Sequence, residues 1–365
     1  QYHRHVSLVT SCGNTRVVAA EDAHALIQDD DVEFCFFVAP PATPARSKLT
    51  WDALTGHPLE ATLLKYKDTV FRTELPKSLP SRRDDVETTI ELTDDEPVAA
   101  KQFRLSPEMR AALQAWTQEM LACKMIRPST SPYAAPTFCV KKKDGWRIVH
   151  DFRGINAKMR VPASPIPRKD DIYDAMSLAW WFSAMDLLWG FFQVRMRERD
   201  IPFTAFSTPD GLFEYLVTPM GLSSSPSSFN RLIQSIFKDM ARYCRGYFDD
   251  VFVFTSLRSI EDHAKAVDRV LQRCEDRQLY VKLSKCVFGA AEIPCLGDLV
   301  GRHGVRMDPA KIKVIREWPM PKTKRQMQSF LGTCVYVSKF CPDFAELMAP
   351  SQMQPRVVRP RTALY

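Results

Sequence analysis

The chain of 365 residues lacks the features that mark several large classes of protein. No apolar run approaches the ~18 residues that a membrane-spanning helix needs. The ten cysteines form no Cys-x-x-Cys pair, so neither a zinc ribbon nor a thioredoxin-like site is indicated. The sequence starts at Gln1 with no basic or apolar leader segment, so we expect no signal peptide and a piece of a longer protein. Reduced thiols in an intracellular protein, cytoplasmic or nuclear, are the simplest expectation.

Negative charge is scarce beyond the first hundred residues. Residues 1–100 contain 10 Lys and Arg against 17 Asp and Glu, whereas the rest of the chain contains 40 against 26. The net charge is therefore −7 in the first segment and +14 in the remainder. Such a basic body favours a polyanionic partner, because Lys and Arg neutralise phosphates and release counter-ions. A solvated basic surface without a partner explains the charge equally well.

The breakers and caps in the sequence predict where regular structure begins. Acidic runs and prolines interrupt residues 1–100, which are expected to form a weakly structured leader. Ser106 followed by Pro107 is a helix-start signal, and apolar residues at a spacing of three to four extend this helix to about residue 124. An Asp-Gly turn at 144–145 predicts a β-hairpin between residues 136–140 and 146–149.

Later segments alternate between strand and helix patterns. We expect a strand at 181–187, a helix from 225 to about 240, two strands joined by a turn within 247–254, a helix at 260–277, and strands near 280–281 and 295–300. This order is a split β-α-β pattern, which folds as an antiparallel sheet with helices on one face. The predicted fold class is α+β.

The pair Asp249–Asp250 differs from the other acidic pairs of the chain because strand-like apolar residues flank it on both sides. These flanks predict a tight hairpin with the pair at its tip. Asp186 is likewise isolated among apolar strand residues, so three carboxylates converge if that strand lies beside the hairpin. Their convergence costs free energy unless a cation neutralises them, and oxygen ligands suit Mg²⁺. Acids that only form a turn and cap a strand are the alternative interpretation.

The segment Tyr247–Phe248–Asp249–Asp250 resembles the Y/F-x-D-D box of reverse transcriptases. Eight further blocks follow in an order and spacing similar to polymerases of gypsy-type LTR retrotransposons. These blocks lie at residues 126–133, 140–145, 151–156, 185–187, 219–222, 283–286, 318–321 and 329–332. The resemblance covers roughly residues 60–350.

The resemblance implies a right-hand polymerase with a split β-α-β (ferredoxin-like) antiparallel palm sheet. Its domains would be an acidic, poorly structured post-protease linker at 1–100, fingers and palm at 101–298, the start of a thumb or connection at 299–350, and a divergent tail at 351–365. The fingers would comprise about 101–165 and 195–225.

The implied activity is that of an RNA-directed DNA polymerase. It would join a dNTP to a primer 3′-OH on an RNA or DNA template, using two Mg²⁺ ions with Mn²⁺ as an alternative. A second copy of the chain, or the ribonuclease H and integrase of a polyprotein, would be further partners, and no membrane would be involved.

The resemblance also assigns roles to individual residues. Asp186, Asp249 and Asp250 would be the catalytic metal ligands, Lys285 a proton donor to pyrophosphate or a phosphate contact, and Lys142 and Arg147 the triphosphate ligands. Phe191 would be a steric gate against the ribose 2′-OH or a core residue, and Leu296 and Gly297 the primer grip. Gln193 and Pro226 would support the geometry of the site, with core or capping roles fitting nearly as well.

Three features depart from the family pattern, and the first is a fingers hairpin that is one residue shorter than usual after Asp144–Gly145. Leu188–Trp189 stands where a polar pair is usual, so an indole could crowd the metal ligands. Asp298 stands where His or Tyr is typical and would add negative charge near the primer backbone. A catalytically inactive, nucleic-acid-binding relic of the same fold is therefore the alternative function, and an unrelated basic nucleic-acid-binding module is a more distant one.

Overall fold

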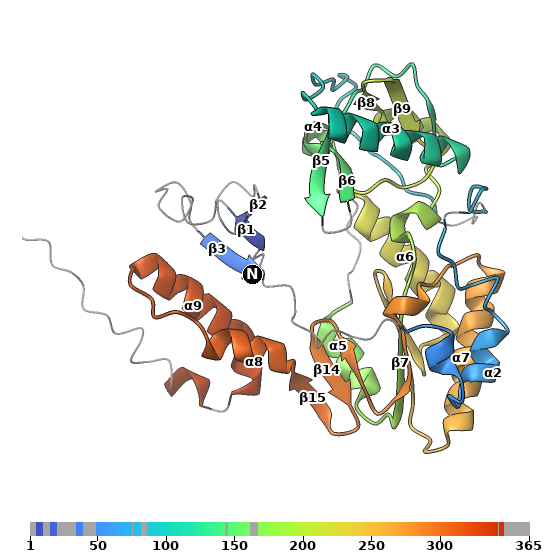
Figure 1. Cartoon of the computed structure of the whole chain (residues 1–365), viewed down its shortest axis with the longest axis vertical. Helices are drawn as coiled ribbons and strands as arrows, with labels where there is room; N and C mark the ends of the chain where they lie inside the picture. The colour runs from blue at the N-terminus through green and yellow to red at the C-terminus, as the bar shows by residue number, and fades with distance from the viewer. Residues whose placement is uncertain are drawn as a thin grey trace, which may run out of the picture. The chain divides into compact units, whose positions relative to one another are not determined.

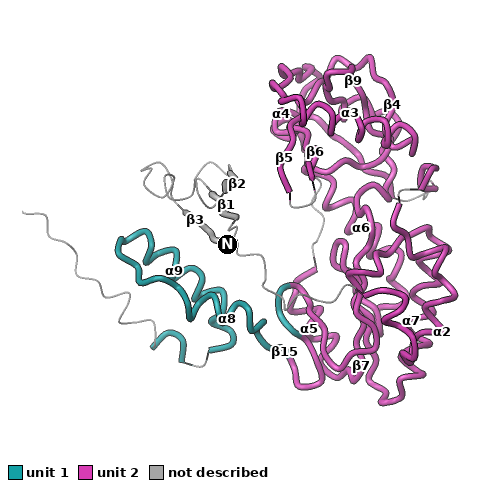
Figure 2. The backbone as a smooth tube through the Cα atoms, in the orientation of Figure 1, with its two compact units in different colours: residues 1–46, 297–299, 305–365 teal, residues 47–296, 300–304 magenta. Residues whose placement is uncertain are grey.

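The computed structural model describes residues 49–74, 76–81, 86–142, 145–160, 167–341 and 343–346, together with the backbone of three earlier strands. The chain divides into two compact units (Figure 2): residues 1–46, 297–299 and 305–365 form unit 1, and residues 47–296 and 300–304 form unit 2. In the described part of the chain, no helix has both the length and the apolar character to cross a membrane. The eight cysteines in that part all carry free thiols, and most are buried.

Unit 2 carries most of the regular structure. Its elements are η1 (Asp52–Leu54), α2 (Glu60–Leu64), α3 (Pro107–Ala122), β4 (Ile126–Pro128), β5 (Thr137–Lys142), β6 (Gly145–His150), α4 (Arg153–Lys158), α5 (Lys169–Met176), β7 (Trp181–Asp186), η2 (Gly190–Gln193), η3 (Glu198–Thr204), β8 (Phe206–Thr208), β9 (Gly211–Tyr215), α6 (Ser225–Phe237), η4 (Lys238–Met240), β10 (Cys244–Tyr247), β11 (Asp250–Thr255), α7 (Ile260–Asp276), η5 (Leu283–Lys285), β12 (Val287–Ala290) and β13 (Glu292–Cys295).

Unit 1 is smaller. Its elements are β1 (His5–Val9), β2 (Thr15–Ala19), β3 (Phe34–Val38), α8 (Pro309–Arg316), α9 (Lys324–Val337) and η6 (Ser338–Phe340). Strands β1 to β3 form an antiparallel sheet in the order β2-β1-β3. The chain passes between the units within β14 (Asp298–Gly301) and β15 (Gly304–Met307).

A four-stranded antiparallel sheet in the order β10-β11-β7-β12 organises one part of unit 2. We call it the central sheet, and its strand β7 is labelled in Figure 1. Helix α6 precedes β10, and α7 lies between β11 and β12 in the sequence. The split β-α-β order predicted from the sequence is therefore confirmed, and so is the α+β class.

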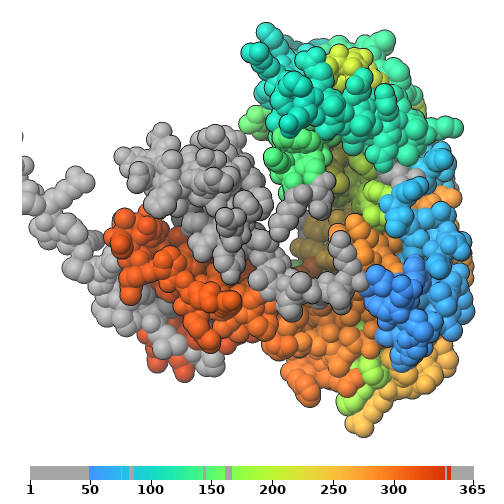
Figure 3. Space-filling model, viewed as in Figure 1, coloured from blue at the N-terminus to red at the C-terminus, as the bar shows by residue number. Residues whose placement is uncertain are grey.

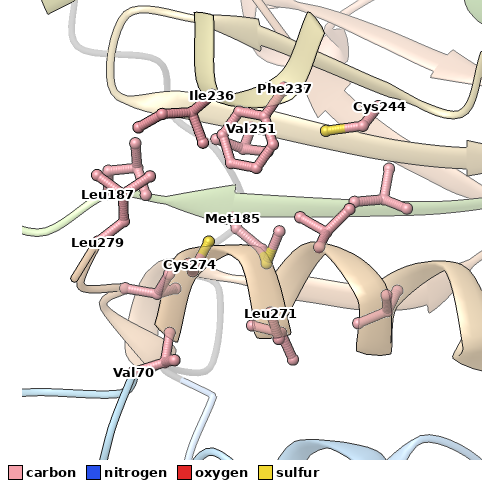
Figure 4. Close-up of a cluster of buried hydrophobic side chains, with 14 of the residues drawn as sticks. Val70, Met185, Leu187, Ile236, Phe237, Cys244, Val251, Leu271, Cys274 and Leu279 are labelled. Atoms are coloured by element: carbon pink, nitrogen blue, oxygen red, sulfur yellow. The ribbon is translucent and has the colours of Figure 1, made fainter. Parts of the chain in front are cut away.

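The two faces of the central sheet differ in what covers them. Met185 of β7 and Val251 of β11 lie opposite each other and are buried in one core with Ile236 of α6 and residues of α7 (Figure 4). Successive strand residues point to opposite faces. Asp186, which follows Met185 in β7, and Asp250, which precedes Val251 in β11, therefore face away from α6 and α7.

Residues 49–74 and 86–100 differ from the predicted weakly structured leader. Leu59, Leu63 and Val70 are fully buried, and they join the core beneath α7. Figure 3 shows this early segment, in blue, on the outside of unit 2. Its apolar residues are too few to form a core alone, but they pack against the apolar residues of α7. The prolines and acidic residues of this segment do not indicate that packing.

A second core in unit 2 packs α3 and the β5–β6 hairpin with the sheet β4-β9-β8. Helix α3 begins as predicted, because the Ser106 side chain caps it by accepting a hydrogen bond from the Met109 N–H at 3.3 Å. The predicted hairpin is also confirmed, since β5 and β6 pair from Thr137–His150 to Lys142–Gly145. The turn residues 143–144 lie outside the described residues.

The predicted strands near 280–281 and 295–300 are only partly correct. Val281 makes isolated bridges with Phe71 and Leu187 and belongs to no ladder. The strand that completes the central sheet is β12, which pairs with β7 through a register shift between Val287 and Ala290. Its short sequence lacks a clean alternation, so the pattern did not predict it.

His263 fastens α7 to the central sheet. Its buried ring lies 2.8 Å from the Ser183 hydroxyl of β7 and 2.9 Å from the Thr255 hydroxyl of β11. Burial lowers the pKa of His263 from 6.5 to about 4. The unfolded chain therefore binds a proton between these pH values that the folded chain does not, and stability is lost as the pH falls below 6.5.

We expect the free energy of unfolding to fall between pH 6.5 and 4.5, with His263 contributing up to ~1.4 kcal/mol per pH unit. Replacing it (His263→Gln) should lower stability near pH 7 and make this pH dependence shallower. Urea unfolding at a series of pH values measures both. Equal slopes for the variant and the parent would contradict the role given to this ring.

Candidate active site

A strained turn joins β10 and β11. Tyr247 and Asp250 pair across it, and Phe248 and Asp249 form its tip. Phe248 has a φ of +49°, a left-handed conformation that a bulky side chain rarely adopts. The tight hairpin predicted around the acidic pair is therefore confirmed, and its backbone conformation is held by its surroundings.

The hydrogen-bond register brings a third acid to this turn. Asp186, the last residue of β7, lies directly opposite Asp250. The next residue, Leu187, donates its N–H to the Asp249 carbonyl at 2.7 Å, and the Asp186 carbonyl accepts from the Lys282 N–H at 2.9 Å. Directly opposed residues of an antiparallel pair project to the same face. Three carboxylates therefore gather at one end of the central sheet, as predicted.

Burial and neighbouring negative charge raise the pKa of two of these carboxylates. Burial and then the negative charge of Asp186 raise the pKa of Asp249 from 3.8 to about 6. The same two causes, together with the charge of Asp249, raise the pKa of Asp250 to about 6. Asp249 remains exposed on one side, so part of its charge still meets water. Near neutral pH the site therefore carries closely spaced negative charges that lack enough positive charge to balance them.

Lys285 supplies the positive charge nearest to the site. Its ammonium lies 3.0 Å from Oδ1 and 2.9 Å from Oδ2 of Asp186. The pair is partly open to water, with 56% of the Lys285 side chain and 23% of the Asp186 side chain exposed. Among the described residues, no group of three or more His, Cys, Asp or Glu side chains already has the arrangement of a metal site. If Asp186 is a metal ligand, its carboxylate oxygens bind the Lys285 ammonium here in place of a metal ion.

Gly190 lies against the acidic turn, and the sequence analysis missed it. A Cβ atom at this position would lie 3.1 Å from Cγ of Asp249 and would overlap its Oδ1. Gln193, which is buried, fixes the same loop: its amide N–H donates to the Leu188 carbonyl, and its Oε1 accepts from the Tyr280 N–H at 3.3 Å. The glycine four residues after Asp186 was the available signal, although spacing alone does not show which side chain it meets.

The two aromatic residues near Asp186 each have a packing partner. The Trp189 ring meets the Tyr280 ring edge to face at 6.1 Å, from a residue with a φ of +60°. The Phe191 ring is half-buried and meets Phe229 of α6 edge to face at 5.5 Å. The Trp189 indole thus packs against Tyr280 beside the site. The role of Phe191 as a steric gate stays a prediction.

The two predicted triphosphate ligands share one face of the β5–β6 hairpin. Lys142 pairs with Gly145 and Arg147 pairs with Val140, so both side chains project to the same side. Both residues are exposed. No hydrogen bond or ion pair between described residues links this hairpin to the three carboxylates.

The predicted primer-grip residues form the turn that follows β13. Leu296 and Gly297 have φ values of +48° and +87°, as expected where two central residues of a hairpin turn are left-handed. The environment of Asp298 was not expected from the sequence, which suggested an added negative charge near the primer. Its carboxylate is buried and lies 2.7 Å from the Lys339 ammonium. Pro226 lies in the first turn of α6, where its missing N–H costs nothing.

Comparison with known proteins places these features in a family. The family model described as "Reverse transcriptase (RNA-dependent DNA polymerase)" matches residues 140–332. The chain is 33% identical over 272 residues to a retrovirus-related Pol polyprotein from transposon 297 of Drosophila melanogaster, covering 73% of this chain and 26% of that protein. It is 34% identical over 284 residues to the corresponding polyprotein from transposon opus, covering 76% and 28%. The chain thus spans about a quarter of these curated relatives.

A solved structure supports the same fold. The chain is similar to a foamy viral protease-reverse transcriptase in complex with double-stranded DNA, with a TM-score of 0.72 and 21% identity over 80% of this chain and 51% of that one. This similarity confirms the polymerase fold expected from the sequence. Because the family model matches more than half of its residues and the relatives are transposon polyproteins, the chain belongs to the reverse transcriptase family, as its resemblance to gypsy-type elements indicated.

Proposed function

We propose that the chain is an RNA-directed DNA polymerase that extends a primer with dNTPs. The observation that carries this proposal is the convergence of Asp186, Asp249 and Asp250 at the end of the central sheet. Packing like charges together lowers stability, and nothing in the fold of the sheet requires it. Such an arrangement is typical of sites where a function needs the charge.

The donor chemistry of these carboxylates fits hard divalent cations. Oxygen ligands suit Mg²⁺, which takes its remaining ligands from water and substrate phosphates. Asp186, Asp249 and Asp250 would hold two such ions, with Lys285 moving off the Asp186 carboxylate as they bind. The ions would lower the pKa of the primer 3′-OH and stabilise the leaving pyrophosphate.

The protein's own groups would position the reactants. Lys142 and Arg147 would bind the triphosphate from one face of their hairpin, and Phe191 would bear on the sugar of the incoming nucleotide. The primer 3′-OH would release its proton to water, and its oxygen would bond to the α-phosphorus as the bond to pyrophosphate breaks. Lys285 would donate a proton to that leaving group. Positioning and charge neutralisation would provide the rate enhancement.

The domains, the nucleic-acid partners and the location of the chain follow from the same proposed activity. We propose fingers at about 101–165 and 195–225, a palm built on the central sheet, and the start of a thumb from residue 299. Template and primer would be the nucleic-acid partners, which is supported by relatives solved in complex with double-stranded DNA and with an RNA/DNA hybrid. A cytoplasmic or nuclear location is supported by the free thiols of the described cysteines.

Primer extension on oligo-dT-primed poly(rA) with Mg²⁺ tests the activity. Asp249→Asn should reduce extension at least ~100-fold, because it removes charge from the transition state. Binding of the primer–template, measured by fluorescence anisotropy, should remain. Asp210→Asn is the matched control, since Asp210 is exposed in the turn between β8 and β9. A parent that binds in a salt-sensitive manner but does not extend would establish the inactive relic instead.

The same substitution should have the opposite effect on stability. Because the pKa of Asp249 is raised on folding, the folded chain loses stability as the pH rises from about 4 to about 6, and the loss persists above that range. Asp249→Asn should therefore raise Tm at pH 7.5 by ~2–4 °C, about 1 kcal/mol after allowing for exposure of the carboxylate. Below pH 4 no gain is expected.

Differential scanning calorimetry of the parent and Asp249→Asn, at pH 7.5 and below pH 4, measures this difference in Tm. Mg²⁺ should raise the Tm of the parent at pH 7.5 and raise that of Asp249→Asn less. A variant that is less stable than the parent at pH 7.5, without metal, would show that repulsion among the carboxylates does not govern the site.

The hairpin lysines provide a test of triphosphate binding. Lys142→Ala should raise the dNTP KM about tenfold, because one charge-assisted hydrogen bond is lost. Lys141→Ala is the matched control, since Lys141 lies on the other face of the hairpin, 5.9 Å above the Trp146 ring. Steady-state kinetics with primer–template in excess measures the dNTP KM of both variants. Similar KM values for Lys142→Ala and Lys141→Ala would remove Lys142 from the nucleotide site.

A further inference from the structure

Asp298 is a buried carboxylate at the start of β14, next to the predicted primer-grip glycine. Its side chain is 0% exposed, and Oδ2 lies 2.7 Å from the Lys339 ammonium. The Lys311 ammonium lies 3.7 Å from Oδ1. These lysines come from α8 and from η6, the turn that follows α9. One carboxylate thus joins three separate segments of unit 1.

Lys311 reaches beyond the carboxylate. Its ammonium donates a hydrogen bond to the Gly297 carbonyl and another, at 3.2 Å, to the Tyr336 hydroxyl of α9. It also lies 4.7 Å from the centre of the Tyr336 ring, close enough for a cation–π contact. A Cβ at position 297 would come within 2.9 Å of this ammonium, so the glycine leaves the space that Lys311 occupies.

Burial makes this cluster sensitive to the loss of either partner. A carboxylate removed from water is destabilising unless a partner balances its charge, and removing one member of a buried pair costs far more than the pair contributes. The two lysine side chains are 25% and 36% exposed, so their ammonium groups keep part of their hydration while they satisfy Asp298. With two ammonium groups and one carboxylate, the cluster as a whole is positive.

We propose that Asp298 is a positioning residue. Its carboxylate holds α8 and the end of α9 against the turn at Gly297, so that the turn keeps the conformation that contacts the primer strand. This inference rests on the proposed polymerase function for what the turn contacts, but the fastening itself does not depend on that function.

Charge alone makes the opposite prediction, which gives the proposal a sharp test. If Asp298 acted only as a negative charge near nucleic acid, Asp298→Asn would tighten binding of a primer–template, because it removes repulsion. If Asp298 positions the turn, the same variant weakens that binding about tenfold while the dNTP KM changes by less than about twofold. Anisotropy titration of the full chain with a labelled primer–template distinguishes these outcomes.

A second variant guards against general unfolding. Lys339→Met removes the ammonium that makes the shorter contact with Asp298 and should weaken binding several-fold. The double variant Asp298→Asn/Lys339→Met should bind better than the product of the two single losses predicts. Lys313→Met removes the same charge from α8, where the exposed Lys313 side chain lies 3.9 Å from the exposed Glu317, and should change binding by less than about twofold.

Hydrogen exchange of α8 and α9 separates this proposal from the proposed function. Both Asp298→Asn and Lys339→Met should speed amide exchange in these helices while exchange in α7 stays unchanged. If the parent binds no primer–template, the polymerase function fails, and the exchange result alone decides whether Asp298 fastens the helices. If the parent binds and extends a primer, unchanged exchange or tighter binding in Asp298→Asn overturns the positioning role.

Discussion

The register between β7 and β11 is the constraint on which the site depends. Pairing Asp186 with Asp250 also pairs Met185 with Val251, and that apolar pair is buried under α6 and α7. A shift by one residue would turn the acids into the core and the apolar residues out of it. Hydrophobic burial on one face of the sheet therefore holds two like charges together on the other, in opposition to their repulsion.

The backbone around the acids strengthens this hold. The turn between β10 and β11 tolerates a left-handed Phe248 while the Leu187 N–H binds the Asp249 carbonyl. Gly190 leaves room for the Asp249 carboxylate, and the buried Gln193 side chain fixes the loop that carries this glycine. Strain and like-charge repulsion are concentrated here, and the large core beneath the central sheet offsets both. A site so arranged is more stable when its charge is removed, which is the expected signature of a function that requires the charge.

Local patterns predicted those parts of the molecule whose cause is local. The Ser106 cap, the hairpin at 137–150 and the acidic turn all follow from residues close together in sequence, and the structure contains each of them. The packing of residues 49–74 was not predictable, because the surface that they cover belongs to α7, about two hundred residues later. The isolated bridges of Val281 likewise depend on distant neighbours.

The contrast between Asp249 and Asp298 shows why residue type alone does not determine the role of an acid. Asp249 stands beside other carboxylates and holds its proton more tightly, whereas Asp298 is enclosed by the ammonium groups of Lys311 and Lys339. In the sequence, Asp298 is a departure from the family pattern that adds negative charge. The lysines that reverse this effect lie 13 and 41 residues further along the chain, so only the folded structure shows that the departure is compensated. An unusual residue at a functional turn is therefore best judged together with the partners that surround it.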